Sequence, residues 1–198
     1  MVEGGVAAYP GIPAWRAGLA ATYCRIGALD KASAIIEGAA SDSFEHVPWD
    51  PIRMTTLVLY ADAAAQSGSI SAAESLYELL EPWADQVIAT DSAGYGHARM
   101  WLGALAHTLG RDGAAVEHLE FACRFHEDSG LLDWAAESHL WLARALARAG
   151  HTDAAREHAR RALELAHAHG YGAVEKRATE LLTDAKTGHP STTSIARS

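Results

Sequence analysis

Three residues within one predicted helix could together hold a metal ion. Cys123, His126 and Glu127 share a helix face at spacings i, i+3 and i+4, and each of these residue types binds Zn²⁺ in proteins. A structural zinc site normally has four ligands, and no second group of ligands elsewhere in the sequence completes this one. We therefore expect a half-buried cysteine with solvated neighbours here, and no metal.

Asp91, Ser92 and His97 supply the side chains of a hydrolase triad. The sequence has no G-x-S-x-G turn, and no oxyanion-binding loop is evident. Asp91 or Ser92 is better explained as the cap of a helix that begins near Gly94. The sequence therefore predicts no catalytic residue, no cofactor site and no enzymatic activity for this chain.

The composition is ordinary for a soluble globular protein, with 49% hydrophobic and 21% charged residues. No apolar run approaches the length of a membrane span, and the first residues lack the basic and apolar regions of a signal peptide. Cys24 and Cys123 are too far apart for a metal or redox motif, which indicates reduced thiols in a cytoplasmic protein. The net charge of −9 disfavours binding to a phosphate backbone, although arginines make the C-terminal quarter basic. We expect no direct binding to nucleic acid or to membranes.

One set of residues recurs along the chain every 40 to 42 positions. Each copy has a large residue followed by a small one, a glycine eight positions after the large residue, and an alanine five positions after the glycine. Small residues let two helix backbones approach closely, and glycine suits the left-handed residue that ends a helix. Trp101 and Trp141 recur at the same period, so packing explains them, and Trp49 is expected to fill a gap between units. The closing glycines are Gly27, Gly68, Gly110 and Gly150.

A period of 20 to 50 residues is typical of solenoids, in which each unit buries its apolar face only against its neighbours. We predict an all-α fold: a right-handed superhelical solenoid of about four helix pairs, closed by a C-terminal helix. The repeat domain spans residues 1–184, and residues 185–198 form a disordered tail because they have almost nothing to bury. The expected helices lie near 13–27, 30–40, 51–67, 71–83, 95–109, 112–127, 131–149, 153–168 and 172–184.

The repeated positions resemble the tetratricopeptide repeat, with a literal L-G pair at Leu102–Gly103, although that repeat usually has 34 residues. Three longer phrases resemble something narrower: SLYELLEPWADQVI at 75–88, WLGALAHTLGRDGAAVEHLEFA at 101–122 and WLARALARAGHTDAAREHARRALELAHAHG at 141–170. They are similar to the C-terminal repeat region of actinobacterial LuxR-type transcriptional regulators and of multidomain adenylate cyclase signalling ATPases. The resemblance covers roughly residues 5–184. It implies a sensor or protein-contact arm.

The sequence lacks the parts of that family that carry its other activities. There is no G-x-x-x-x-G-K-[ST] phosphate loop, no helix-turn-helix after residue 184, and no cyclase segment with paired metal-binding aspartates. We expect the chain to be either a piece of a larger regulator or a free-standing repeat protein.

The register of the repeat selects side chains for a concave groove. In tetratricopeptide-like arrays the first helix of each pair lines this face, so positions 13, 6 and 2–3 before each closing glycine should point inward. The groove is expected to be acidic or neutral at one end and basic at the other, which suits a protein or peptide partner. The candidate groove residues are Arg25, Asp62, Gln66, His97, His107, Glu137, Arg144 and Arg148.

Three alternatives remain open. The groove could close around a small-molecule effector through Trp15, His97, His107 and Arg144, or it could be no more than a solvated face. A homodimer through the N-terminal edge, residues 1–40, is compatible with each of these functions, because an upstream repeat would otherwise cover that edge.

Overall fold

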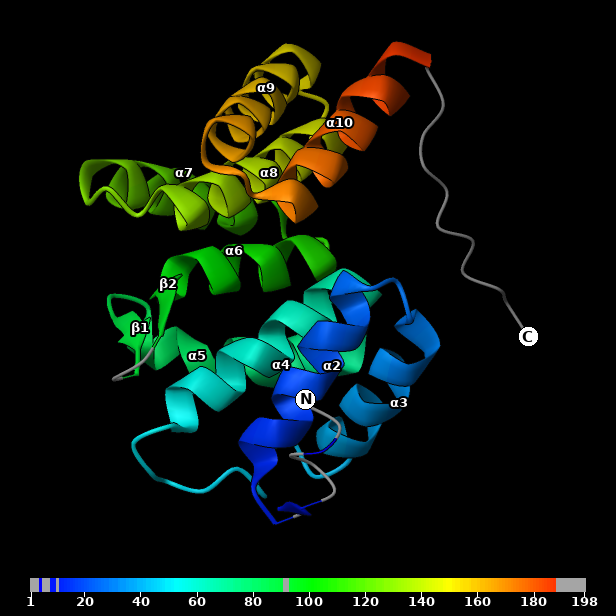
Figure 1. Ribbon diagram of the computed structural model, residues 1–198, viewed down its shortest axis with the longest axis vertical. Helices are drawn as coiled ribbons and strands as arrows, with labels where there is room; N and C mark the ends of the chain where they lie inside the picture. Colours follow the sequence, from blue (N-terminus) through cyan, green and yellow to red (C-terminus); the bar gives the residue numbers. More distant parts are fainter. Residues whose placement is uncertain (1–3, 5–7, 10, 91–92, 188–198) are drawn as a thin grey trace.

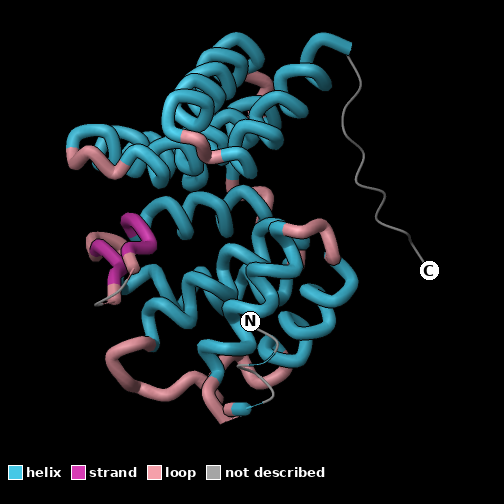
Figure 2. Tube along the Cα trace, viewed as in Figure 1, coloured by secondary structure: helices cyan, strands magenta, loops and turns pink. Residues whose placement is uncertain are grey.

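The computed structural model describes residues 4, 8–9, 11–90 and 93–187. In these residues the fold is all-α apart from a 3-10 turn and one small hairpin, which confirms the all-α part of the predicted fold (Figures 1 and 2). The elements are α2 (Pro13–Arg25), α3 (Leu29–Ala40), α4 (Arg53–Ser67), α5 (Ile70–Leu80), η1 (Glu81–Trp83), β1 (Val87–Ala89), β2 (Gly94–His97), α6 (Ala98–Thr108), α7 (Asp112–Asp128), α8 (Leu132–Arg148), α9 (Thr152–His169) and α10 (Gly172–Thr187).

The helices pack in sequential pairs, and the first helix of each pair also contacts the first helix of the next. The pairs are α2 with α3, α4 with α5, α6 with α7 and α8 with α9. Between pairs, α2 contacts α4, α4 contacts α6, α6 contacts α8, and α8 contacts α10. Figure 1 shows this progression along the long axis, from α2–α5 in the lower half through α6 to α7–α10 above. The first helices therefore form a connected row through the molecule.

Small residues set the spacing of the helices. Alanines from most of the helices are fully buried, and Gly103 of α6 lies so close to α7 that an added Cβ would be 2.4 Å from Leu119 Cγ. The four closing glycines all have positive φ, from 74° at Gly68 to 86° at Gly150, as expected from the sequence. The repeated residues therefore correspond to close contacts between helices and to the turns that end the helices.

The expected helix over 95–109 begins later than predicted. Residues 94–97 are extended and pair antiparallel with β1, and α6 starts at Ala98. His97 is the N-cap, and its Nδ1 accepts a hydrogen bond of 3.3 Å from the Arg99 backbone N–H. Asp91 and Ser92, the expected caps, lie outside the described residues. Trp101 of α6 is also bonded to the hairpin, because its Nε1–H donates a hydrogen bond of 2.8 Å to the Tyr95 carbonyl.

The exposure of Trp49 and the end of the last helix differ from the predictions. Trp101 and Trp141 are buried as predicted. Trp49 is 80% exposed and fills no gap between units. It lies in the 41–52 connector, where Arg53 stacks over its ring. Helix α10 continues to Thr187, three residues beyond the predicted end of the domain, and residues 188–198 lie outside the described part of the chain. None of the described helices has both the length and the apolar character needed to cross a bilayer.

Candidate binding cleft

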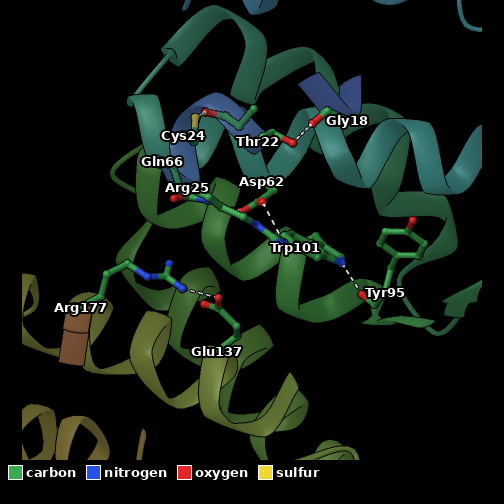
Figure 3. Close-up of polar contacts among 11 residues, drawn as sticks. Gly18, Thr22, Cys24, Arg25, Asp62, Gln66, Tyr95, Trp101, Glu137 and Arg177 are labelled. Atoms are coloured by element: carbon green, nitrogen blue, oxygen red, sulfur yellow. Dashed lines mark hydrogen bonds and ion pairs between the residues drawn. The ribbon is translucent and has the colours of Figure 1, made fainter. Parts of the chain in front are cut away.

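A cleft of about 850 Å³ lies where the row of first helices meets the hairpin. The C-terminal end of α2 supplies Arg25, α4 supplies Gln66, and β2 supplies Tyr95. The opposite wall comes from Trp134 and Glu137 of α8 and from α10, whose contribution includes Arg177. Figure 3 shows the two polar groups facing one another, Arg25 with Asp62 and Gln66 on one side and Glu137 with Arg177 on the other.

Asp62 is a buried acid beside this cleft. Its Oδ1 accepts a 2.6 Å hydrogen bond from Gln66 Nε2, and its Oδ2 lies 3.8 Å from Nη2 of the largely exposed Arg25. Burial is the main cause that raises the pKa of Asp62 to about 6, and the nearby Glu137 carboxylate raises it further. Arg25 and the Gln66 hydrogen bond oppose this shift without cancelling it. Because Arg25 and Gln66 offset little of the cost of its burial, the charged Asp62 carboxylate disfavours folding at neutral pH. Such unfavourable buried charges are typical of binding sites.

Glu137 lines the cleft and has a spare carboxylate oxygen. Its Oε1 accepts a short hydrogen bond from Arg177 Nη2, while Oε2 is buried and has no partner in the described part of the chain. Arg144 follows two helical turns later on α8, and its guanidinium lies 4.8 Å from the centre of the Trp141 ring. Burial, with the nearby Arg177 charge, lowers the pKa of Arg144 to about 10, so it remains charged at neutral pH.

One wall of the cleft is aromatic. Trp134 lies edge-on to Trp101 with ring centres 5.7 Å apart, and Tyr95 lies 6.5 Å from Trp134. Such rings provide flat, rigid apolar surface for a bound chain or ring. The cleft therefore combines an acidic floor formed by Asp62 and Glu137, the exposed side chain of Arg25 at the rim, and an aromatic wall.

Five of the eight predicted groove residues gather at this cleft. Arg25, Gln66 and Glu137 line it, with Asp62 bonded to Gln66 and Arg144 close to Glu137. His97, His107 and Arg148 do not line the cleft.

Arg148 lies one turn after Arg144 on α8, and it contacts His107 of α6. Arg148 pairs with Asp112 and also donates to the carbonyl of His107, while His107 packs 6.0 Å from the Trp141 ring. Burial is the main cause that lowers the pKa of His107 to about 4, which keeps the imidazole neutral. These two residues therefore belong to the α6–α8 contact rather than to the cleft.

His97 does not reach the cleft, in contrast to the expectation. Its ring is buried between Phe121 and Phe125, with centres 4.9 and 4.6 Å away. The reason is that residue 97 ends a strand, so a helical register does not apply to it. None of Trp15, His97, His107 and Arg144, the residues suggested for an effector site, lines the cleft.

The possible metal ligands have other roles. His126 is fully buried; its Nε2 accepts from the His97 backbone N–H at 2.8 Å, and its Nδ1 lies 2.9 Å from Ser138 Oγ. Glu127 is bonded to Arg161 at 2.8 Å, and Cys123 is buried rather than half-buried. In the part of the chain that the structure describes, no group of three or more His, Cys, Asp or Glu side chains is placed to hold a metal.

Among the cleft residues that sequence reasoning missed are Tyr95, Trp134 and Arg177. Arg177 lies 40 positions after Glu137, so one more step of the repeat would have found it on the closing helix. Trp134 lies one turn before Glu137 on α8 and was expected only to fill space between helices. Tyr95 had no such signal, because it is positioned by the unforeseen hairpin.

Replacing Asp62 with asparagine should stabilise the protein by about 1–2 kcal/mol at pH 7.5, because the uncharged amide avoids a buried charge and can still accept from Gln66. The pKa of Asp62 is raised from 3.8 to about 6, so its stabilising contribution is present below pH 3.8 and is lost as pH rises through 6. The difference in unfolding free energy between D62N and wild type should therefore grow between pH 4 and 6 and then level off. Denaturant melts at several pH values measure it.

Asp153→Asn is the matched control, because its side chain is fully exposed. D153N should stay within about 0.5 kcal/mol of wild type at every pH. If D62N were less stable than wild type by the same amount at pH 4.5 and 7.5, the charge on Asp62 would not be the costly feature described above.

Comparison with protein-family models, with curated proteins and with solved structures gave no match in any of the three.

Proposed function

We propose that this chain is a non-catalytic helical-repeat module that binds a short segment of a protein partner in the cleft, with an arginine or lysine of the partner against the acidic floor. The observation that carries the proposal is the spare, buried Oε2 of Glu137 near the costly buried carboxylate of Asp62. A buried acceptor without a partner is unfavourable until a donor reaches it. A basic side chain supplies that donor.

The distribution of charge favours a basic side chain over an acidic one. Arg25 and Lys176 also line the cleft, but their side chains are 59% and 78% exposed, so they are solvated and mobile at the rim. Arg177 is as buried as Glu137, with 20% against 22% of the side chain exposed, but it is already paired with Glu137 Oε1, whereas Oε2 is buried without a partner in the described residues. Electrostatic interactions strengthen with burial, so a further cation is favoured at this oxygen. The net charge of −9 adds a general attraction for a basic partner.

A peptide segment fits the remaining chemistry of the cleft. Gln66 and Arg25 can bind backbone carbonyls at the rim, and Trp134 and Tyr95 offer apolar surface to neighbouring side chains. Cys24 at the same cleft is a poor nucleophile, because burial and the Asp62 charge raise the pKa of its thiol to about 12. This supports binding rather than catalysis. A small effector is the second candidate, since a volume of about 850 Å³ also suits a small molecule.

We further propose that the helix pairs form a right-handed superhelical solenoid, with the cleft on its concave side. The row of contacts from α2 through α4, α6 and α8 to α10 supports this, because tetratricopeptide-like arrays stack in the same order. The resemblance to LuxR-type regulators and adenylate cyclase ATPases motivates a wider role, as the regulatory or sensor arm of a larger cytoplasmic signalling protein. A homodimer through the N-terminal edge also remains a proposal; Ile26 and Leu29 are exposed there at 70% and 42%.

Selection of peptides from a random display library tests the proposed function. Wild type should enrich sequences with a common arginine or lysine, and Glu137→Gln should bind the selected peptides about tenfold more weakly, because a charge-assisted hydrogen bond is lost. Glu157→Gln is the matched control, since Glu157 is exposed on α9 and away from the cleft. E157Q should bind as wild type does.

Two other results would count against the peptide proposal. Selected peptides without a shared basic residue, or equal binding by E137Q and wild type, would remove the assigned role of Glu137. If free arginine bound as tightly as the peptides, the effector function would replace the peptide function.

A further inference from the structure

A second pocket, of about 650 Å³, lies at the N-terminal end of the fold and takes no part in the cleft. Its walls are mostly apolar and come from α2 and α3, with Leu19 and Ile35 as the largest contributors. Its polar residues come from three different elements: Arg16 from α2, Asp42 and His46 from the 41–52 connector, and Tyr60 from α4. An apolar pocket with a few convergent polar groups is the usual form of a small-molecule site.

Tyr60 carries a hydroxyl group that the fold leaves without a partner. The residue is fully buried, it lines the pocket, and its hydroxyl has no hydrogen-bond partner in the described residues. Arg16 and Asp42, whose charges act on the Tyr60 phenol, line the same pocket. Burial raises the pKa of Tyr60 to about 12, so the group is a neutral donor at neutral pH.

His46 is oriented by Asp42. The Nδ1 of His46 lies 2.9 and 3.0 Å from the two carboxylate oxygens of Asp42. A carboxylate only accepts, so the proton of the imidazole is on Nδ1, and Nε2 remains for another partner. The His46 ring is edge-on to Tyr60, with centres 6.2 Å apart.

The connector holds this arrangement at a cost in backbone energy. Ser43 and Phe44 both have positive φ, 54° and 64°, a backbone conformation that is unfavourable for residues other than glycine. Phe44 is fully buried against Tyr60, with ring centres 5.2 Å apart, and this packing fixes the turn. This turn places Asp42 before the strained residues and His46 after them, and both side chains line the pocket.

Arg16 supplies the one full positive charge of the pocket's polar end. No ion pair to Arg16 occurs within the described residues, and its side chain lies at the exposed rim. Arg16 and the Tyr60 hydroxyl are two hydrogen-bond donors that line the same apolar pocket. Two such donors match the two oxygens of a carboxylate.

We propose that this pocket binds a small carboxylic acid with an apolar body, whose carboxylate contacts Arg16 and Tyr60 while its hydrocarbon part lies against Leu19 and Ile35. The site is independent of the cleft, so its occupation could be sensed separately from the binding of a protein partner.

Titration of the full chain with hexanoate, followed in ¹H–¹⁵N spectra, tests the proposal; hexan-1-ol and hexylammonium are controls of the same length. Hexanoate should shift the amide signals of residues 35–46 and 60, and the two controls should bind at least about tenfold more weakly, since they lack an anion for Arg16. Arg16→Gln should weaken hexanoate binding about tenfold and leave the binding of hexan-1-ol unchanged.

Tyr60→Phe gives the sharpest variant, because it keeps the ring and removes only the hydroxyl. Y60F should weaken hexanoate binding about tenfold while leaving the melting temperature equal or higher, since the hydroxyl has no partner in the free protein. A purely structural hydroxyl would give the opposite result, a loss of stability without a loss of binding. Equal binding of hexanoate and hexan-1-ol, or no shift with hexanoate at 20-fold excess over millimolar protein, would overturn the proposal.

Discussion

Gly103→Val should lower the free energy of unfolding by about 3 kcal/mol, because a side chain at this position overlaps the next helix. An added Cβ would lie 2.4 Å from Leu119 Cγ and 2.9 Å from Leu119 Cδ2, well inside contact distance. Leu119 is fully buried, so it has no free space into which to move. Helices α6 and α7 would have to separate at the centre of the molecule. Urea or guanidinium melts of G103V and wild type measure the loss.

Two further variants show that contact with Leu119, rather than loss of a glycine, is responsible. Gly113→Ala in α7 should be neutral or stabilising by up to about 1 kcal/mol, because a Cβ there meets no atom within 4 Å. In the double variant G103A/L119A the new methyl group enters the space that Leu119 leaves. The combined cost should be smaller than the sum of the single costs by about 1 kcal/mol or more. Strict additivity would contradict the close-packing explanation of the repeat.

His126→Ala should also destabilise the fold by about 3 kcal/mol, through a cavity and two lost hydrogen bonds. The Nε2 of His126 accepts from the His97 backbone N–H, so the ring proton is on Nδ1 and is donated to Ser138 Oγ. Without the imidazole, a buried backbone N–H and a buried hydroxyl lose their partner. The same bonds join β2, α7 and α8, which place Tyr95 and Trp134 at the cleft. H126A should therefore weaken peptide binding as well as lower stability.

The pH dependence of the His126 contribution has the opposite sign to that of Asp62. Burial lowers the pKa of His126 from 6.5 to about 4, so its stabilising contribution is fully present above pH 6.5 and is lost as pH falls through 4. The difference between wild type and H126A should shrink as pH decreases across this range. His151→Ala, at an exposed position before α9, is the control and should change stability by less than about 0.5 kcal/mol. A cost for H126A that is small at neutral pH would show that the network is not needed.

The sequence predicted the helices well because their signals are local and repeated. A glycine with positive φ follows the first helix of each pair, and the spacing of small residues marks the contacts between helices. These glycines are Gly27, Gly68, Gly110 and Gly150. The hairpin was missed because its strands have three and four residues and are stabilised by pairing across a turn, which leaves no periodic pattern. His97 was assigned to the groove for the same reason.

The candidate cleft was only partly accessible from the sequence. Asp62 and Gln66 could be placed on one helix face from their i, i+4 spacing, but the raised pKa of Asp62 depends on burial between helices that are far apart in sequence. The spare oxygen of Glu137 likewise follows from its bond to Arg177 on the closing helix. The second pocket depends on two strained residues, Ser43 and Phe44, whose types give no indication of positive φ.

The most direct test of the cleft's function is the affinity of two capped peptides that differ at one position, one with arginine and the other with its uncharged isostere citrulline. Binding is followed by ¹H–¹⁵N spectra on the full chain. We expect the arginine peptide to bind at least about tenfold more tightly and to shift the amide signals of Gln66, Trp134, Glu137 and Ala173, which line the cleft. Equal affinities for the two peptides, or shifts confined to residues outside the cleft, would contradict a basic side chain at the acidic floor.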